Sequence, residues 1–520
     1  MTRTFDRGRR AVIAIAALAA IVSALTAPSA TAQAPSSGPS PSASTSVGRW
    51  LPAASPNVSL QYHTATLLPD GKVLVVGDGT SQRYDPAINT WIPTTYPNAA
   101  HFCGTATLLR DGRVLVASRN ASELYDPVAN TWTATGRMSI ARFCPTATLL
   151  LDGRVLVVGG EPPAPTTFPA VWFTEDTAEV YDPATGTWTS AGRMSEHRSG
   201  HTATLLSNGK VLVVGGMRAV MDDFTIAGAE IYDPAAGTWT AAGSSTARQV
   251  HSAIALPSGE VMVIGGLDGV SISVTDVFDP RTGVWKILEP LHIARGFATA
   301  TLLGNGRVLV AGGMDADFHL PAESCCTDVA TAELYDVGTG RWLAAGNLQT
   351  ARHGHSATLL QDGRVLVVGG ATGFSGGTPL ASAELYEPAV IPFAAGYTGS
   401  WYSPAQSGHG FVLEVLPGDP MRLLAGWFTF APQGGPSWIV GVGPISGDRA
   451  VLQGYQAVGS GGRFPPNFNA AAVRQESWGT LTFTFSDCNH GRVEWISTAP
   501  DYGSGGMDLT RLTLPAGLTC

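Results

Sequence analysis

Short apolar runs recur along this chain, and each follows a turn rich in Asp, Asn, Ser and Gly. In one representative unit, residues 146–149 alternate between polar and apolar side chains, Asp152 and Gly153 follow, and residues 155–158 are all apolar. Alternation with a period of two predicts a half-buried strand, and a short continuous apolar run predicts a strand covered on both faces. We therefore expect a β-hairpin, with Asp152 and Gly153 in the two positive-φ positions of a tight turn.

A second pair of strands is predicted after each hairpin. An aromatic residue precedes a turn of Asp-Pro type, and a tryptophan stands seven positions after that aromatic residue. Proline pre-sets the backbone for the first turn position, so the aromatic residue closes a third strand and the tryptophan begins a fourth. The pairs are Tyr84 and Trp91, Tyr125 and Trp132, Tyr181 and Trp188, Tyr232 and Trp239, Phe278 and Trp285, and Tyr335 and Trp342.

The chain contains seven predicted hairpins but only six of these pairs. The last unit reaches Tyr386 without a following tryptophan, whereas Gly48-Arg49-Trp50 precedes the first hairpin. One such unit cannot bury its own apolar faces, so the units must pack on one another. We expect the Trp50 segment to supply the outer strand of the last unit, because this closes a ring and removes the exposed edges.

The double glycine after the apolar run, together with the Tyr-x6-Trp spacing, resembles the kelch repeat over about residues 48–390. The resemblance implies an all-β fold, a seven-bladed kelch-type β-propeller with four strands in each blade. The first two units depart from the pattern, with Gly77-Asp78 and Ala117-Ser118 in place of the glycine pair.

Four regions are predicted along the chain. Residues 1–32 have a basic start, an apolar run and small residues at 30–32, which indicates a signal peptide. Residues 33–47 are a Ser/Pro-rich disordered linker. The propeller occupies 48–392, and a small antiparallel β domain occupies 396–520. This last domain resembles a module at the ends of exported bacterial proteins; we expect its tryptophans to form a core, with stacking on sugar rings as the alternative.

Composition narrows the range of partners. The 520 residues carry a formal charge of −9, which disfavours nucleic acid and anionic membranes because both require a basic surface. No membrane span is expected after removal of the signal, and we predict a secreted or periplasmic protein. Six cysteines in an exported chain indicate disulfides.

The positions of the cysteines suggest three pairs. Cys325 and Cys326 are adjacent, and Cys488 and Cys520 are the two in the last region, which leaves Cys103 with Cys144. Cys103 and Cys144 hold the same register in neighbouring units, where inner strands lie about 4.8 Å apart. Disulfides accept Cα separations of roughly 4.4–6.8 Å, so this bridge is feasible.

Equivalent positions of the repeat predict rings of side chains near one end of the central channel. Nine residues before the turn glycine stand Tyr62, Cys103, Cys144, Gly200, Val250, Phe297 and Gly354. One position later stand the histidines His63, His201, His251 and His355, which either bind a metal or are structural. Eleven residues before the glycine stand Arg142, Arg198, Arg248, Arg295 and Arg352. We expect these arginines to pair with the carboxylates two residues before each aromatic residue, with an anion-binding ring as the alternative.

Two short segments also resemble copper-radical oxidases of the galactose oxidase type. Tyr62-His63 is similar to the segment that supplies copper ligands there, and Phe143-Cys144-Pro145 is similar to the segment that carries a tyrosine-linked cysteine. The resemblance implies copper bound by Tyr62, His63 and a further histidine such as His201 or His355. The chain departs from that family where the crosslinked tyrosine is expected, because Gly200 stands there, and a Cys103–Cys144 disulfide explains the cysteine without copper.

We therefore predict an exported, non-enzymatic protein that recognises a protein or glycan and needs no cofactor. Binding is expected in the loops between the second and third strands, which vary most in length and span 161–177, 217–228, 314–331 and 371–383. The carboxylates Asp315, Asp317 and Asp328 in one of these loops either bind calcium or are solvated. A copper oxidase acting on an alcohol or aldehyde, and carbohydrate binding by the C-terminal domain, are the alternatives.

Overall fold

The computed structural model describes most of the chain from residue 48 onward. The described residues are 48–163, 172–220, 225–320, 324–337, 340–373, 377–388, 398–403, 410–416, 421–430, 436–446, 449–458, 474–485, 490–499 and 502–512. Their regular secondary structure is β throughout, as predicted, and none of them belongs to a helix long and apolar enough to cross a membrane. The predicted signal peptide and linker lie outside these residues, as do Cys488 and Cys520.

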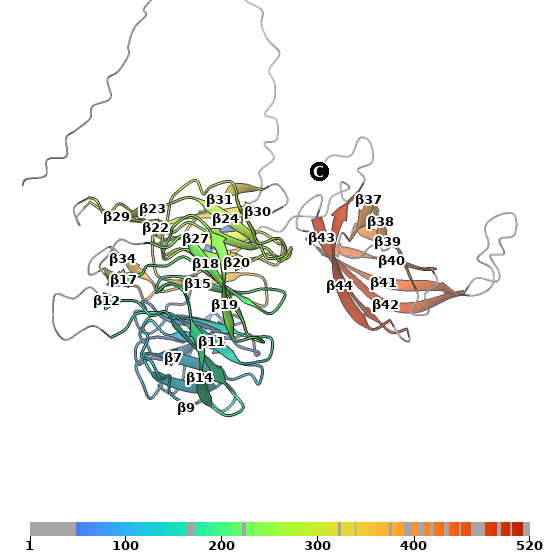
Figure 1. Cartoon of the computed structure of the whole chain (residues 1–520). Coiled ribbons are helices and arrows are strands. Elements are labelled where there is room, and N and C mark those ends of the chain that lie inside the picture. The colour runs from blue at the N-terminus through green and yellow to red at the C-terminus, as the bar shows by residue number, and fades with distance from the viewer. Residues whose placement is uncertain are drawn as a thin grey trace, which may run out of the picture. The chain divides into compact units, whose positions relative to one another are not determined.

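Seven four-stranded antiparallel sheets form the propeller and confirm the predicted number of blades (Figure 1). From the inner to the outer strand they are, for blade 1, β2 Thr64–Leu67, β3 Val73–Val76, β4 Ser81–Asp85 and β5 Thr90–Pro93; for blade 2, β6 Thr105–Leu108, β7 Val114–Ser118, β8 Ala121–Asp126 and β9 Thr131–Ala134; for blade 3, β10 Thr146–Leu149, β11 Val155–Val158, β13 Thr177–Asp182 and β14 Thr187–Arg193; for blade 4, β15 Thr202–Leu205, β16 Val211–Val214, β18 Gly228–Asp233 and β19 Thr238–Ser244; for blade 5, β20 Ser252–Ala255, β21 Val261–Ile264, β24 Thr275–Asp279 and β25 Val284–Ile287; for blade 6, β26 Thr299–Leu302, β27 Val308–Ala311, β30 Thr331–Asp336 and β31 Arg341–Asn347; and for blade 7, β32 Ser356–Leu359, β33 Val365–Val368, β36 Ala383–Glu387 and β1 Arg49–Ala53.

The N-terminal strand β1 closes the ring, as the sequence predicts. It pairs antiparallel with β36, and Trp50 stands opposite Tyr386 in the register of the other aromatic–tryptophan pairs. The Trp50 indole nitrogen also donates to the carbonyl of Ala345 in blade 6 at 3.0 Å. Blade 7 is therefore built from both ends of the propeller segment, and β1 covers the edge of β36.

The repeated spacing of tyrosine and tryptophan has a simple structural reason. Tyr181 and Trp188 face each other across β13 and β14 with ring centroids 5.1 Å apart. The indole nitrogen of Trp188 then donates to the carbonyl of Gly136, in the segment that leaves blade 2, at 2.9 Å. The same arrangement recurs around the ring, so each tryptophan joins its own blade to the preceding one.

The inner hairpin turn differs from the expectation in one respect. Gly153 has a φ of 92°, but Asp152 does not adopt a positive φ. Gly153 donates to Leu150 at 3.0 Å and Leu150 donates to Arg154 at 2.8 Å, which gives a three-residue loop with a single left-handed glycine. The aspartate instead accepts a hydrogen bond from the backbone of Arg154 through Oδ1 at 3.0 Å. The carboxylate therefore stabilises the turn through its side chain, and its own φ stays negative.

The C-terminal region forms a closed eight-stranded antiparallel barrel. Its strands are β37 Gly399–Tyr402, β38 Gly410–Leu416, β39 Arg422–Phe430, β40 Pro436–Ser446, β41 Arg449–Val458, β42 Arg474–Phe485, β43 His490–Ser497 and β44 Ser504–Arg511. The barrel encloses an apolar core that includes Trp401, Trp427 and Trp478. The expectation that aromatic residues form the core is confirmed for these three.

Four additional two-stranded sheets arise from the long loops of blades 3 to 7. They pair β12 Trp172–Phe173 with β17 Ala219–Val220, β22 Leu267–Asp268 with β23 Val270–Ser271, β28 Met314–Ala316 with β29 Cys326–Asp328, and β34 Ala371–Thr372 with β35 Thr378–Pro379. All follow the second strand of a blade, so they belong to one face of the propeller, which we call the insertion face. Figure 1 shows β12, β17, β22, β23, β29 and β34 along one side of the propeller.

Candidate functional site

The five repeated arginines lie in the interior of their blades. Arg142 is fully buried, and its guanidinium group donates to the carbonyls of Gly159 and Thr177 and to the Glu179 carboxylate at 3.2 Å. Burial lowers the pKa of Arg142, and the hydrogen bond and charge of Glu179 oppose that shift. The other four are paired in the same way: Arg198 with Glu230, Arg248 with Asp276, Arg295 with Glu333, and Arg352 with Glu384.

This pairing is the one predicted from the repeat register. Each arginine links the segment entering its blade to the second and third strands, and each carboxylate also accepts backbone N–H groups from the connection between blades. Glu179, for example, accepts from the N–H of Ser139 at 2.8 Å. The geometry therefore gives the arginines a structural role, and their predicted role in binding a ligand receives no support from it.

A sixth member of this series is His101, which the sequence reasoning missed. It stands eleven residues before Gly112, where later blades have arginine, and its Nε2 lies 2.8 Å from Glu123 Oε2. Burial raises the pKa of Glu123, but hydrogen bonds from His101, Asn98 and Ala99 outweigh burial and lower it overall. The register identifies His101, because it occupies the same repeat position as the arginines although its residue type differs.

The repeated histidines connect neighbouring blades. His201, at the start of blade 4, places Nε2 2.9 Å from the hydroxyl of Thr146 in blade 3. The same contact occurs between His251 and Thr202 at 2.9 Å, His355 and Thr299 at 3.0 Å, and His63 and Ser356 at 2.8 Å. The last of these joins blade 1 to blade 7, so the histidines follow the closed ring.

Burial keeps these imidazoles neutral. It lowers the pKa of His63 to about 4 and, together with nearby arginines, lowers the pKa of His201 and His355 to about 3. The pKa of His251 also falls well below its ordinary value for the same reason. A neutral, buried imidazole with its Nε2 shared with a hydroxyl is a structural group, and among the described residues there is no group of three or more His, Cys, Asp or Glu side chains that could hold a metal ion.

The double glycine of one blade provides space for the histidine of the next. A side chain at Gly159 would place Cβ 2.5 Å from the carbonyl of Arg198 and 2.7 Å from Cε1 of His201. Gly215, Gly312 and Gly369 meet His251, His355 and His63 in the same way. The glycine pair and the histidine are therefore one packing device that spans two blades.

The ring nine residues before the turn glycines exists and has a left-handed backbone throughout. The φ angles are 50° for Tyr62, 48° for Cys103, 49° for Cys144, 64° for Gly200, 47° for Val250, 54° for Phe297 and 59° for Gly354. Backbone hydrogen bonds run along it, for example from Cys144 N to Cys103 O at 2.8 Å and from Phe297 N to Val250 O at 2.9 Å. Five of the seven positions carry side chains despite the steric cost of this conformation for residues other than glycine.

Cys103 and Cys144 form the expected disulfide across this ring. Their Cα atoms are 4.8 Å apart, the spacing predicted for neighbouring inner strands. The bridge engages the sulfur of Cys144, and Gly200 at the next ring position offers no phenol. With His63 Nε2 shared with Ser356, the residues suggested for copper do not fit a copper–radical centre.

The long loops of the insertion face contact one another across the boundaries between blades. β12 of the blade 3 loop pairs with β17 of the blade 4 loop. Val270 of blade 5 bridges Asp317 of blade 6, and the Ser271 hydroxyl donates to the Met314 carbonyl at 2.9 Å. The loops thus form a continuous wall over blades 3 to 7, while the connections in blades 1 and 2 are short.

The blade 6 loop contains the predicted bridge between the adjacent residues Cys325 and Cys326. Two residues further on, Asp328 Oδ1 lies 2.6 Å from His353 Nδ1, and its Oδ2 accepts the N–H of Gly373 at 2.6 Å. This carboxylate therefore connects blades 6 and 7. The calcium alternative has no cluster among the described residues to support it.

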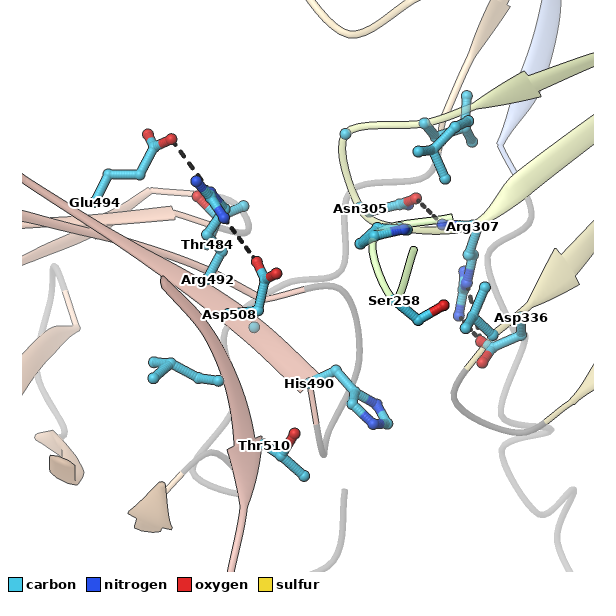
Figure 2. A pocket seen from close by; sticks show the side chains of 18 residues that line it. Ser258, Asn305, Arg307, Asp336, Thr484, His490, Arg492, Glu494, Asp508 and Thr510 are labelled. Carbon is cyan, nitrogen blue, oxygen red and sulfur yellow. Dashed lines mark hydrogen bonds and ion pairs between the residues drawn. The ribbon is translucent and has the colours of Figure 1, made fainter. Parts of the chain in front are cut away.

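The barrel shows two kinds of outer surface. Val412, Phe428, Val440 and Tyr455 are exposed on strands β38 to β41. On β43 and β44, Arg492 lies between Glu494 at 3.3 Å and Asp508 at 2.8 Å, as Figure 2 shows. The same figure shows, within blade 6, Arg307 beside Asp336 at 2.9 Å. Tyr455 is therefore exposed enough to stack on a sugar, whereas the core tryptophans are buried.

Comparison with known proteins identifies relatives of the repeated segment. Residues 250–292 match the family model described as the Kelch motif. The chain is 31% identical over 109 residues to Kelch-like protein 34 of Homo sapiens, which covers 21% of this chain and 16% of that protein. It is 29% identical over 122 residues to a galactose oxidase of Gibberella zeae, which covers 22% of this chain and 15% of that enzyme. This chain thus spans less than a fifth of either relative's length.

A solved structure shares the fold over most of the chain. It is described as a novel fungal alcohol oxidase of the AA5 family in complex with copper, and it aligns with a TM-score of 0.55 and 19% identity over 90% of this chain and all of its own. At this identity the similarity concerns the fold alone.

Proposed function

Since this chain is a kelch-repeat β-propeller protein, we propose that it is a non-enzymatic recognition protein that binds a protein or glycan ligand through its insertion face. The observation that carries the proposal is the wall of joined loops over blades 3 to 7. Loops held by a rigid scaffold are where binding residues concentrate. The repeated charged residues, in contrast, are used inside and between the blades.

The blade 6 loop gives the sharpest test. Purified full-length protein is screened against a glycan array and against extracellular proteins, and each ligand found is titrated against a variant in which residues 314–331 are replaced by a two-residue turn. We expect at least a tenfold loss of affinity. Leu320→Asp, an exposed position in the same loop, provides a point variant, and Asn305→Ala in the opposite-face turn of blade 6 is the control. Equal binding by wild type and both loop variants would contradict the proposal.

A copper-dependent oxidase is the alternative that the shared fold supports. Bound copper would accept electrons from an alcohol or aldehyde, with dioxygen as the final acceptor that leaves as peroxide, and Tyr62 and His63 would be the first candidates for its ligands. The engagement of His63 Nε2 by Ser356 and of Cys144 by Cys103 argues against it. Metal analysis of the protein after exposure to copper, with a peroxide-release assay, tests this. Stoichiometric copper with turnover on an alcohol would replace the recognition proposal.

The proposed export rests on the N-terminal sequence and is supported by the two disulfides, since disulfides persist in oxidising compartments. Fractionation of the producing cells, followed by N-terminal sequencing, is expected to recover a protein that begins after residue 32. Recovery of the intact chain from the cytoplasm would contradict export.

A further inference from the structure

Blades 1 and 2 leave an open sector on the insertion face. Their second and third strands are joined by short turns, in which Gly77 donates to Thr80 at 2.9 Å and Ser118 pairs with Ala121. No two-stranded sheet stands on either blade among the described residues. Within the described residues, the ring therefore has no such sheet beside it on this sector.

A strip of aromatic residues and one disulfide crosses the open sector. The rings of Tyr62 and Phe102 are 5.6 Å apart in an edge-to-face contact. Phe102 is next to Cys103, which is bridged to Cys144, and Cys144 is next to Phe143. We call Tyr62, Phe102, Cys103, Cys144 and Phe143 the aromatic strip. The disulfide joins Cys103 to Cys144 at its centre. The strip is rigid before any ligand binds, which favours affinity.

Arg119 stands at the end of the aromatic strip in an unusual conformation. Its guanidinium carbon lies 4.9 Å above the ring of Phe143. It occupies the first position of a two-residue hairpin turn with a φ of 54°, where glycine or asparagine is usual. Strained residues of this kind persist where the surroundings hold them, and they gather at functional sites. Here two backbone hydrogen bonds with Arg142, at 2.7 and 2.9 Å, hold the turn.

The Arg119 charge is available to a ligand. The side chain is exposed and has no ion pair with any residue that the structure describes. The stack on Phe143 leaves the edge of the guanidinium plane free to donate hydrogen bonds, which suits a carboxylate. The single arginine in the long loops of blades 3 to 7, Arg218, is paired with Glu196.

The opposite side of this face carries the opposite charge. Three loop carboxylates of blades 5 and 6 have no ion pair within the described part of the chain: Asp268, Asp315 and Asp317. These residues do not make a site by themselves, but they discriminate between ligands that Arg119 would accept. A polyuronate would be repelled by them, and a neutral glycan would leave Arg119 without a partner. A peptide with basic side chains and a carboxylate matches both.

We propose that the insertion face binds an extended peptide segment of a protein partner, with a ligand carboxylate held by Arg119 and basic side chains directed to the loops of blades 5 and 6. This inference rests on the proposed recognition function and specifies its ligand. The aromatic strip supplies the floor on which the apolar part of the segment lies. Electrostatic complementarity of this kind sets orientation and specificity.

The test is a binding cycle that uses full-length protein. Fluorescein-labelled peptides of alternating lysine and glycine, ending either in a free carboxylate or in an amide, are titrated by anisotropy against wild type, Arg119→Gln and Arg341→Gln. Arg341 is an exposed residue of β31 without an ion pair among the described residues, so its variant is a control matched in charge. We expect the carboxylate peptide to bind wild type and the control about tenfold more tightly than the amide, and Arg119→Gln to abolish this difference.

A second variant separates the charge of the loops from the anchor. Asp315→Asn is expected to weaken both peptides about equally and to preserve the carboxylate preference. Binding that does not distinguish the two peptides, or stronger binding of polygalacturonate than of the carboxylate peptide, would overturn the inference. The recognition function is tested separately, by the ligand screen and the blade 6 loop variants. It can therefore hold even if this inference fails.

Discussion

At the scale of single residues, the propeller depends on neutral histidines that occupy space left by glycine. The imidazole of His201 hydrogen-bonds to Thr146 in the preceding blade, and Gly159 leaves room for its ring. A protonated imidazole in this position would be a charge without water around it, which is unfavourable. The contact therefore depends on both pH and the absence of a Cβ atom.

The neutral histidines predict a loss of stability in weak acid. The unfolded chain binds protons on these groups near pH 6.5, whereas His63 in the folded chain does so only near 4 and His201 near 3. Stability therefore falls as the pH drops from 6.5 toward 4, by about 1.4 kcal/mol per pH unit for each such histidine. We expect His201→Gln to reduce this slope by about one proton in denaturant titrations between pH 6.5 and 4.5. An unchanged slope would contradict the prediction.

The glycine adjacent to the imidazole gives a separate prediction. Gly159→Ala places Cβ against the Arg198 carbonyl and the His201 ring, so we expect a loss of roughly 2–5 kcal/mol from steric overlap and the left-handed φ. Gly237 has a similar φ of 66° with nothing within 4 Å of its Cβ position. Gly237→Ala is the control and should cost only about 1–2 kcal/mol. Equal losses in thermal unfolding would show that the contact with His201 is unimportant.

At the scale of the blade, a buried ion pair joins the entering segment to the sheet. Blades 3 to 7 use an arginine with a carboxylate, and blade 2 uses His101 with Glu123. Blade 1 has Leu60 and Gln82 instead, and Gln82 accepts the backbone N–H of Asn57 at 3.0 Å. Blade 1 thus lacks the charged pair, but its Gln82 side chain still accepts a hydrogen bond from the segment that connects the blades.

This comparison predicts how blade 3 responds to substitution. Glu179→Gln alone leaves Arg142 buried without its counter-charge, and we expect a loss of about 3–5 kcal/mol. The double variant Arg142→Leu with Glu179→Gln reproduces the blade 1 combination and should recover most of that loss. Denaturant unfolding of the two single variants and the double variant measures the coupling. Additive losses would contradict the pairing as the source of the cost.

At the scale of the whole propeller, stability depends on closing the ring. The ring of Trp50 packs against that of Tyr386 with centroids 5.2 Å apart, and its indole nitrogen donates to Ala345, so one residue of the N-terminal strand contacts blades 7 and 6. The equivalent residue of blade 5, Trp285, makes the same contacts, with Phe278 at 5.0 Å and the Ala242 carbonyl at 2.8 Å. The difference is that β1 continues into blade 1 on one side only, whereas the strand of Trp285 lies between two blades in the chain.

Loss of this strand should therefore open the propeller. Trp50→Ala is expected to lower stability by about 2–4 kcal/mol and to make residues 49–53 accessible to protease before the rest of the propeller. Trp285→Ala should cost a similar amount without selective cleavage, because its strand is tethered at both ends. Limited proteolysis with mass spectrometry distinguishes the two. Simultaneous cleavage throughout the propeller in Trp50→Ala would contradict this account.

Repetition made most of the fold predictable. The spacing from Tyr181 to Trp188 reports a contact across two strands, and seven copies of the inner hairpin gave the blade number. The register also predicted the Cys103–Cys144 bridge and the arginine pairs. It failed at His101, where residue type differs and position does not, and at Asp152, where local hydrogen bonding rather than composition decides φ.

By itself, the sequence determined which residues are equivalent, because a period shared by all blades must be built from the same local contacts. Only the tertiary structure decided what these residues do, since their partners come from neighbouring blades and are far apart in the chain. His201 meets Thr146 across a blade boundary, and Arg119 lies over Phe143. The open sector over blades 1 and 2 likewise depends on how loops of different length pair in space, which no periodic pattern records.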